Sequence, residues 1–221
     1  MLEPSTLKFL KDLKKNNDKS WFDLHRPDYE NARKNFENFI QHLIVKTGKK
    51  DPEIAGLKAK DCLFRINRDI RFSKDKTPYK SNFGASVNRG GKKSVFAGYY
   101  FHLEPGNSFV GGGLWAPMPP DLQKVRQEID YCFDEFRKLL AAKNFKETYG
   151  ELDRSEEHTL SRVPRGYQPD NSAAEFLKLK NLIAMRPVSD KELLSEKLVT
   201  ESSNAFHALA PVIHFINRAI Q

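Results

Sequence analysis

Six cations crowd into the short stretch FRINRDIRFSKDKTPYKSNFG, which runs from Phe64 to Gly84. They are Arg65, Arg68, Arg71, Lys74, Lys76 and Lys80. Only Asp69 and Asp75 oppose them within this stretch. Arginine presents a planar fork that suits phosphate or carboxylate, whereas lysine supplies a mobile point charge. The excess of cations therefore predicts a site for an anion.

We expect these side chains to gather on one face of a sheet. Alternation with period two from about Cys62 predicts a strand that turns Phe64 and Ile66 to the core, and Arg65 and Asn67 the other way. We expect the ligand to be bound by Arg65, Asn67, Arg68, Arg71, Lys74, Tyr79, Lys80, Ser86, Gly112 and Trp115. In particular, we expect Arg65, Arg71 and Lys80 to converge on one anion.

Four further residues on or near this face have expected roles in binding or catalysis. Trp115 would form a stacking wall, and Gly112 lies in a glycine run that would let a ligand approach the backbone. His102 is the acid or base candidate, because an imidazole pKa of about 6.5 permits either proton role at neutral pH. Asp69 is the second catalytic candidate and would hold an arginine in place.

Two structural alternatives stand beside these roles. Asp69 and Asp75 could form an ion-pair network that pins an irregular loop to the sheet. His102 could be a histidine that simply hydrogen-bonds a sheet neighbour such as Tyr100 or Glu104. The sequence leaves both alternatives open.

The elements that must position these residues predict an α+β fold. Period-two alternation predicts strands near 83–87 and 99–103. The turn at 105–107 predicts a hairpin into a strand at 108–115, antiparallel to 99–103 in a meander, and the short apolar run 181–187 predicts a further strand. Apolar residues at helical spacing predict flanking helices. We expect a helical amino-terminal third, a helix from Pro119 to about Ala142, and a carboxyl-terminal helix.

Composition narrows the class of protein. The 221 residues suit one globular domain, residues 1–221, and nine basic residues against two acidic ones from Arg65 to Lys93 carry most of the net charge of +8. No run of about 18 apolar residues predicts a membrane span, and no signal peptide is recognisable. Cys62 and Cys132 are isolated in apolar company, which indicates buried thiols in the cytoplasm.

Several familiar motifs fail on inspection. GGKKSV at Gly90 lacks the spacing of a phosphate loop, and GGGLWA at Gly111 is followed by prolines where a dinucleotide fold needs a helix. The histidines and cysteines form no pattern typical of a zinc site. The sequence therefore predicts no metal and indicates no particular cofactor.

Several uncommon strings occur in a recognisable order: NRDIRFSKDKTPYKSNFG, GYYFHLEPGNSFVGGGLWAP, LSRVPRGYQPD and FLKLKNLIAMRP. Over nearly the whole chain the sequence resembles a bacterial and fungal family of conserved hypothetical proteins, a domain of unknown function. The resemblance implies an intracellular single-domain protein. It implies no activity, cofactor or catalytic residue.

Three functions fit these observations. The first is binding of, or catalysis on, an anionic small molecule that carries phosphate or carboxylate. The second is binding of nucleic acid, whose phosphate backbone would follow the same cations. The third is a non-catalytic domain whose basic face meets an acidic protein. A salt titration separates the second from the first, because counterion release makes nucleic-acid affinity fall steeply with salt.

Overall fold

The computed structural model describes residues 1–71 and 75–221 of the chain. Within these residues, four antiparallel strands form one sheet in the order β1-β2-β3-β4. The strands are β1 (Phe83–Val87), β2 (Gly98–Leu103), β3 (Ser108–Leu114) and β4 (Leu182–Val188). The predicted α+β fold with a meander sheet is confirmed.

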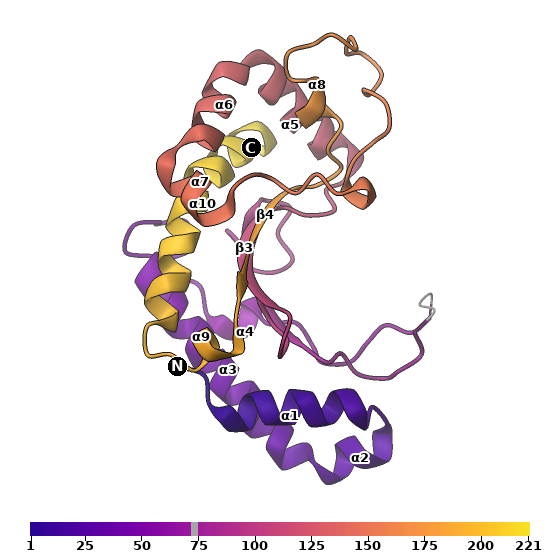
Figure 1. The fold of residues 1–221 in the computed structure, drawn as a ribbon, viewed down its shortest axis with the longest axis vertical. Helices are drawn as coiled ribbons and strands as arrows, with labels where there is room; N and C mark the ends of the chain where they lie inside the picture. Colours follow the sequence, from indigo (N-terminus) through magenta and orange to yellow (C-terminus); the bar gives the residue numbers. More distant parts are fainter. Residues whose placement is uncertain (72–74) are drawn as a thin grey trace.

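Helices form both ends and the back of a crescent (Figure 1). Before the sheet come α1 (Pro4–Lys15), α2 (Lys19–Leu24), α3 (Arg26–Thr47) and α4 (Ala59–Cys62). Between β3 and β4 come α5 (Pro119–Tyr131), α6 (Phe133–Ala141), α7 (Lys143–Tyr149), the 3-10 turn η1 (Glu156–His158) and α8 (Ala174–Leu177). The chain ends with α9 (Asp190–Leu193) and α10 (Leu198–Ile220). None of the helices described is long and apolar enough to cross a membrane.

One face of the sheet packs against α3 and α10. Alternate strand residues point to this face, and burial of each large side chain contributes about 1.5 to 3 kcal/mol. Phe101 meets Phe39 of α3 edge to face at 4.8 Å between ring centroids, and Tyr99 stacks on Phe206 of α10 at 4.6 Å. The opposite face is turned toward the hollow of the crescent, and none of the helices described packs across it (Figure 1).

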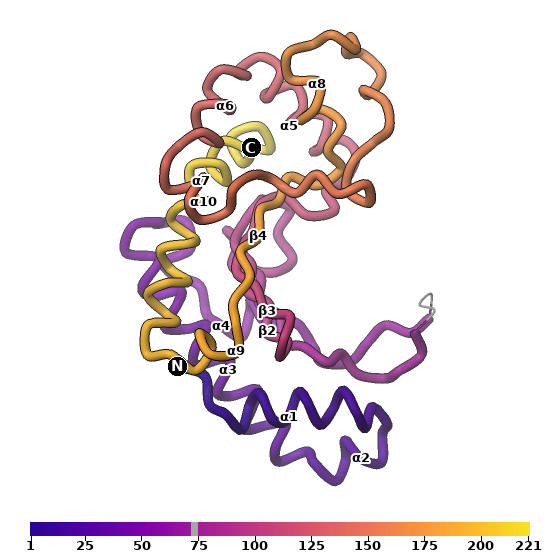
Figure 2. Tube along the Cα trace, viewed as in Figure 1, coloured from indigo at the N-terminus to yellow at the C-terminus, as the bar shows by residue number. Residues whose placement is uncertain are grey.

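Two segments flank this hollow. The tube in Figure 2 shows residues 65–71 and 75–80 projecting from the sheet on one side and the 150–180 region on the other. We call the described part of the first segment, 65–71 and 75–80, the arm. Its base is an irregular hairpin, in which Arg68 donates its backbone N–H to Pro78 at 2.9 Å and Lys80 donates to Ile66 at 2.8 Å. This pairing fixes Lys80 beside the sheet.

The predicted strand from Cys62 is absent from the described structure. A helical turn, α4, ends at Cys62, and only isolated bridges such as Leu63 with Ala85 follow it. Leu63 and Ile66 are buried, so the residues that face the core in this segment do not alternate with period two. Phe64, which we expected in the core, is 40% exposed and lies on the open side of the sheet.

The helix predicted from Pro119 to about Ala142 is divided at Cys132, where α5 ends and α6 begins. Arg218 of α10 explains the bend. Its guanidinium lies 2.7 Å from Glu128 of α5 and 2.9 Å from Glu135 of α6, and the break lets both carboxylates reach it. Periodicity alone predicts one helix because both pieces turn an apolar stripe to the same core.

The backbone of β3 requires glycine at the positions of its glycine run. Gly113 has a φ of +120°, and a side chain there would collide with the carbonyl oxygen of Leu182 on β4. From the sequence, the run that includes Gly112 is expected to let a ligand approach the backbone. Close strand contact requires glycine at these positions whether or not a ligand binds.

Gly113→Ala should therefore cost about 2 to 4 kcal/mol of unfolding free energy, because backbone strain and a steric clash add. Gly106→Ala is the matched control, since Gly106 also has a positive φ but has open space around it. Its cost should stay near 1 kcal/mol. Urea denaturation measures both variants, and equal losses would show that the contact with β4 is unimportant.

Candidate functional site

The open face of the sheet is the floor of a cavity of about 620 Å³. Its floor residues are Ser86 of β1, Tyr100 and His102 of β2, Phe109 of β3, and Ile183 and Met185 of β4. Ser86 and Tyr100 are register partners, as are His102 and Phe109. Ser86 and His102 therefore share one face of the sheet, opposite the buried Val87 and Phe101.

Aromatic rings cover much of this floor. Phe109 stacks on the ring of His102 with centroids 4.7 Å apart and planes 8° apart. Tyr100 lies 5.7 Å from Phe109, and Phe64 reaches over Tyr100 at 6.3 Å. A floor of this kind favours a flat apolar group in the bound molecule.

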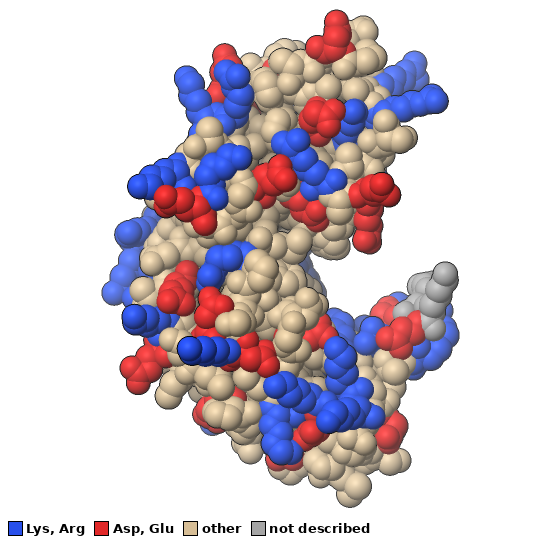
Figure 3. Space-filling view, in the orientation of Figure 1, with Lys and Arg blue, Asp and Glu red and all other residues tan. Residues whose placement is uncertain are grey.

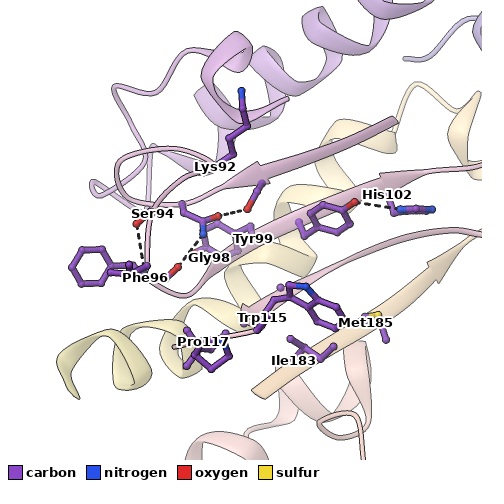
Figure 4. Close-up of a pocket in the computed structure, with 18 of the residues that line it drawn as sticks. Lys92, Ser94, Phe96, Gly98, Tyr99, His102, Trp115, Pro117, Ile183 and Met185 are labelled. Carbon is purple, nitrogen blue, oxygen red and sulfur yellow. Dashed lines mark hydrogen bonds between the residues drawn. The ribbon is translucent and has the colours of Figure 1, made fainter. Parts of the chain in front are cut away.

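Trp115 stands at the end of β3, above Ile183 and Met185 (Figure 4), and is 63% exposed. The next residue, Ala116, has a φ of +46°, which is unusual for a residue with a side chain. Its N–H donates to the buried side chain of Asn181 at 2.7 Å. Strained backbone that is held by such a bond is typical of functional positions. Trp115 is thus held in the cavity wall.

Lys80 brings a cation to the cavity from the base of the arm. Its Nζ lies 5.7 Å from the centre of the Phe64 ring. Burial lowers the pKa of Lys80, and the neighbouring charges of Arg65 and Arg68 lower it further. No carboxylate among the described residues forms an ion pair with it. An ammonium group in this state gains from any anion that enters the cavity.

His102 is engaged by protein groups at both ring nitrogens. Nδ1 lies 3.2 Å from the amide of Asn82. It also lies 3.4 Å from the hydroxyl of Tyr100, a contact drawn as the dashed line to His102 in Figure 4. Nε2 lies 3.3 Å from the carboxylate of Glu104. Because an ionised carboxylate only accepts, the proton belongs on Nε2 and Nδ1 is the acceptor. This arrangement matches the alternative in which His102 hydrogen-bonds its sheet neighbours.

Burial governs the charge states in this network. It lowers the pKa of His102, while Glu104 opposes the shift, so the ring is neutral at neutral pH. Burial also raises the pKa of Tyr100 to about 12, so its hydroxyl keeps its proton. Glu104 has a lowered pKa because hydrogen bonds from His102, Asn107 and Lys14 outweigh its burial. His102 can therefore act on a ligand only through Tyr100 or by giving up a protein partner.

Of the predicted ligand-binding residues, the structure brings four to the cavity, Lys80, Ser86, Gly112 and Trp115, and the catalytic candidate His102 joins them. Ser86 donates to the side chain of Asn88 at 2.6 Å, which in turn donates to the backbone of Phe96. These bonds are drawn in Figure 4. The hydroxyl proton of Ser86 is therefore already used in a hydrogen bond within the protein.

The arginines of the arm do not line the cavity. Arg71 forms a two-bond pair with Asp69, at 3.0 and 2.8 Å, and both side chains are exposed. Asp69 therefore holds an arginine as expected, but neither residue lines the cavity. Arg65 is exposed and is close enough to lower the pKa of Lys80. Arg65 and Arg71 therefore do not share the cavity with Lys80, and the convergence of the three on one anion stays a prediction.

The other predicted residues of the arm have structural partners or lie elsewhere. Arg68, which we expected to bind the ligand, is half-buried and bonds Asp75 at 3.1 Å and the carbonyl of Tyr79 at 3.3 Å. Tyr79 is buried and stacks on Phe22 with centroids 4.0 Å apart. Asn67 pairs with Tyr79 in an isolated bridge. Lys74 lies outside the described residues.

A group with metal-ligating atoms lies away from the cavity. Asp51, Glu53 and His214 each place one such atom within 4.8 Å of the others. The buried carboxylate of Asp51, however, accepts from Tyr99 at 2.5 Å and lies 3.6 Å from His214. The protein therefore already uses these oxygens to join the loop after α3 to the sheet and to α10.

Comparison with known families adds one finding. A family model described as conserved hypothetical protein (DUF2461) matches residues 5–215. The chain belongs to the DUF2461 family. A search of curated proteins gave no match, and a search of solved structures gave none either.

The DUF2461 cavity also contains residues that the sequence did not indicate. His158 of η1 lines the wall near Trp115, and its ring meets the indole edge to face at 5.1 Å. Asp153 binds His158 at 2.6 Å. A spacing of five residues in an irregular segment matches no helix or strand period, so only the fold could reveal this pair. Asp121, at the start of α5, lines the same wall.

The lowered pKa of His102 predicts a pH dependence of stability. Below a pH of about 6.5 the unfolded chain takes up this proton more readily than the folded protein, so acidification weakens folding. Wild type should lose stability relative to His102→Gln between pH 7.5 and 5.5, as measured by urea denaturation. If wild type instead gains stability over the variant on acidification, pairing with Glu104 dominates and the ring is protonated in the fold.

Proposed function

We propose that this DUF2461 protein binds a small organic anion with a flat apolar body in the cavity on the open sheet face. Lys80 carries the proposal, because its ammonium is half-buried, has no acidic partner among the described residues and borders an aromatic surface. Leaving a cation in such a place costs stability unless an anion compensates it. A bound phosphate or carboxylate would supply that compensation.

The rest of the cavity supports an apolar body rather than a bare ion. Phe64, Phe109 and Trp115 present aromatic surface, and Ile183 and Met185 add aliphatic contact. Exposed apolar groups that gather in a concave site with a few polar ones are typical of ligand sites. A flat ring would lie against the floor while its acidic group meets Lys80.

Nucleic-acid binding is the second proposal, and one observation favours it. Figure 3 shows Lys and Arg side chains gathered along α1 and the arm, at one rim of the hollow. The opposite wall includes Asp121, and the exposed Glu156 and Glu157 belong to η1 next to His158. Carboxylates on that side would repel a phosphate backbone that crossed the hollow. We therefore favour the small anion, and an acidic protein partner meets the same objection.

The protein would act in the cytoplasm. Burial raises the pKa of the Cys62 thiol to about 11, so it behaves as an inert core residue. Both cysteines are free, which suits a reducing compartment.

Titration with 1-naphthyl phosphate tests the small-anion proposal, and 1-naphthol is the neutral comparison. Wild type should bind the phosphate more tightly than the alcohol by isothermal calorimetry. Lys80→Met should weaken phosphate binding about tenfold, the loss expected for one charge-assisted hydrogen bond. It should leave the weak binding of the alcohol almost unchanged.

Lys93→Met is the matched control, because Lys93 is exposed and does not line the cavity. Equal weakening by both variants would mean that phosphate affinity depends only on the net charge of the protein, which would contradict the proposal. Tighter binding of a 12-nucleotide single strand, with affinity that falls steeply with salt, would favour the nucleic-acid function instead.

A further inference from the structure

The pair formed by Asp153 and His158 gives the cavity a second polar centre, apart from Lys80. The side chain of His158 is 14% exposed and that of Asp153 is 18% exposed, so both are largely shielded from solvent. The carboxylate of Asp153 lies 2.6 Å from Nδ1 of His158, and the Ser155 hydroxyl lies 3.2 Å from the same nitrogen. Asp153 also accepts the backbone N–H of Ser155 at 2.9 Å. The turn that carries His158 therefore fixes the carboxylate as well.

The charge state of Asp153 fits a role in orienting the ring. Burial would raise the pKa of this carboxyl, but hydrogen bonds from Ser155 and His158 outweigh burial and lower it. An ionised Asp153 at 2.6 Å keeps the proton of a neutral imidazole on Nδ1. The lone pair of the ring is then on Nε2. No hydrogen bond from a described residue reaches Nε2.

His158 and His102 differ in the one property that proton transfer requires. Both line the cavity, but both nitrogens of His102 have protein partners, whereas only Nδ1 of His158 does. The position of His158 is also fixed on its other side, where Trp115 meets its ring edge to face. An oriented imidazole with one free nitrogen, on a residue that lines a cavity, is suited to act as a general base.

We infer that His158 is a catalytic residue of the cavity, with Nε2 as general base and Asp153 as its positioning residue, and that the cavity hydrolyses carboxylic esters. Nε2 takes a proton from a water molecule as the water oxygen bonds to the acyl carbon. The carbon–oxygen bond to the leaving alcohol then breaks, and the alcohol oxygen takes the proton from Nε2. One water is consumed, and a carboxylic acid and an alcohol are formed.

Esters fit this cavity because their hydrolysis gives a carboxylate, an organic anion of the kind that Lys80 would bind. In this respect the inference rests on the proposed function. The acid–base step does not itself require Lys80, so the two proposals can fail separately. The titration with naphthyl phosphate reports on the anion site, whereas a neutral ester reports on His158.

Hydrolysis of 4-nitrophenyl acetate, followed by the absorbance of the released nitrophenol, tests the inference. Wild type should exceed the rate given by an equal concentration of free imidazole. His158→Asn should lose at least about 100-fold, the lower range of what a general base supplies. Asp153→Asn should lose about tenfold, as is usual when a group that orients a functional histidine is removed. The exposed His42, on α3 and outside the cavity, provides the control His42→Asn, which should stay within about twofold of wild type.

Nitrogen NMR of the histidine rings separates positioning from a merely structural role. In the wild type, the ring of His158 should carry its proton on Nδ1, and in Asp153→Asn the two tautomers should mix while the other histidine signals stay in place. A wild-type rate no higher than that of free imidazole would overturn the inference. So would a rate that falls equally in His42→Asn, or an Nε2 that is protonated in the neutral ring.

Discussion

The packing of α10 and α3 against one face of the sheet is the interaction on which the rest of the structure depends. It buries Tyr99 and Phe101 and leaves the alternate residues of the same strands uncovered. A sheet face that carries Phe109, Met185 and Ile183 would ordinarily be covered by another layer of helices. Here the chain between β3 and β4 forms one end of the crescent instead, and the apolar face becomes a cavity floor.

Charge is distributed around this floor in a way that follows from the same topology. The arm leaves the sheet at one rim and brings Lys80, while the segment after α7 brings His158 and Asp153 to the wall near Trp115. Some ionisable groups near the cavity are neutralised by partners, as Asp69 is by Arg71 and Glu104 by Lys14. Lys92, which also lines the cavity, donates to the backbone carbonyl of Lys60. Among the described residues, no carboxylate pairs with Lys80 and no hydrogen bond reaches Nε2 of His158. These are the two atoms through which a bound molecule would be recognised and altered.

Much of the fold could be predicted from alternation and spacing. Strands at 83–87 and 99–103 followed from period two, because one face of each is buried and the other is not. The division at Cys132 could not be predicted, because it depends on Arg218, which is distant in sequence. The position of Phe64 was predicted wrongly for a local reason, since the chain leaves α4 without forming a regular strand and its buried residues Leu63 and Ile66 do not follow a period of two.

The site was predictable in part for the same reasons. His102, Ser86 and Trp115 lie on or at the end of regular strands, so their faces followed from the period. The arginines of the arm were grouped by charge alone, and charge does not indicate which cations are neutralised nearby. His158 could not be found because its partner is fixed by an irregular turn and its place in the cavity depends on the return of the chain to β4.

A crystal structure of the protein with 1-naphthyl phosphate bound would test the central claim most directly. The account predicts a phosphate oxygen within hydrogen-bonding distance of Nζ of Lys80, and the naphthyl ring against the aromatic floor beside Trp115. A phosphate held by Arg65 or Arg71 on the outside of the arm, with the cavity filled by water, would contradict it.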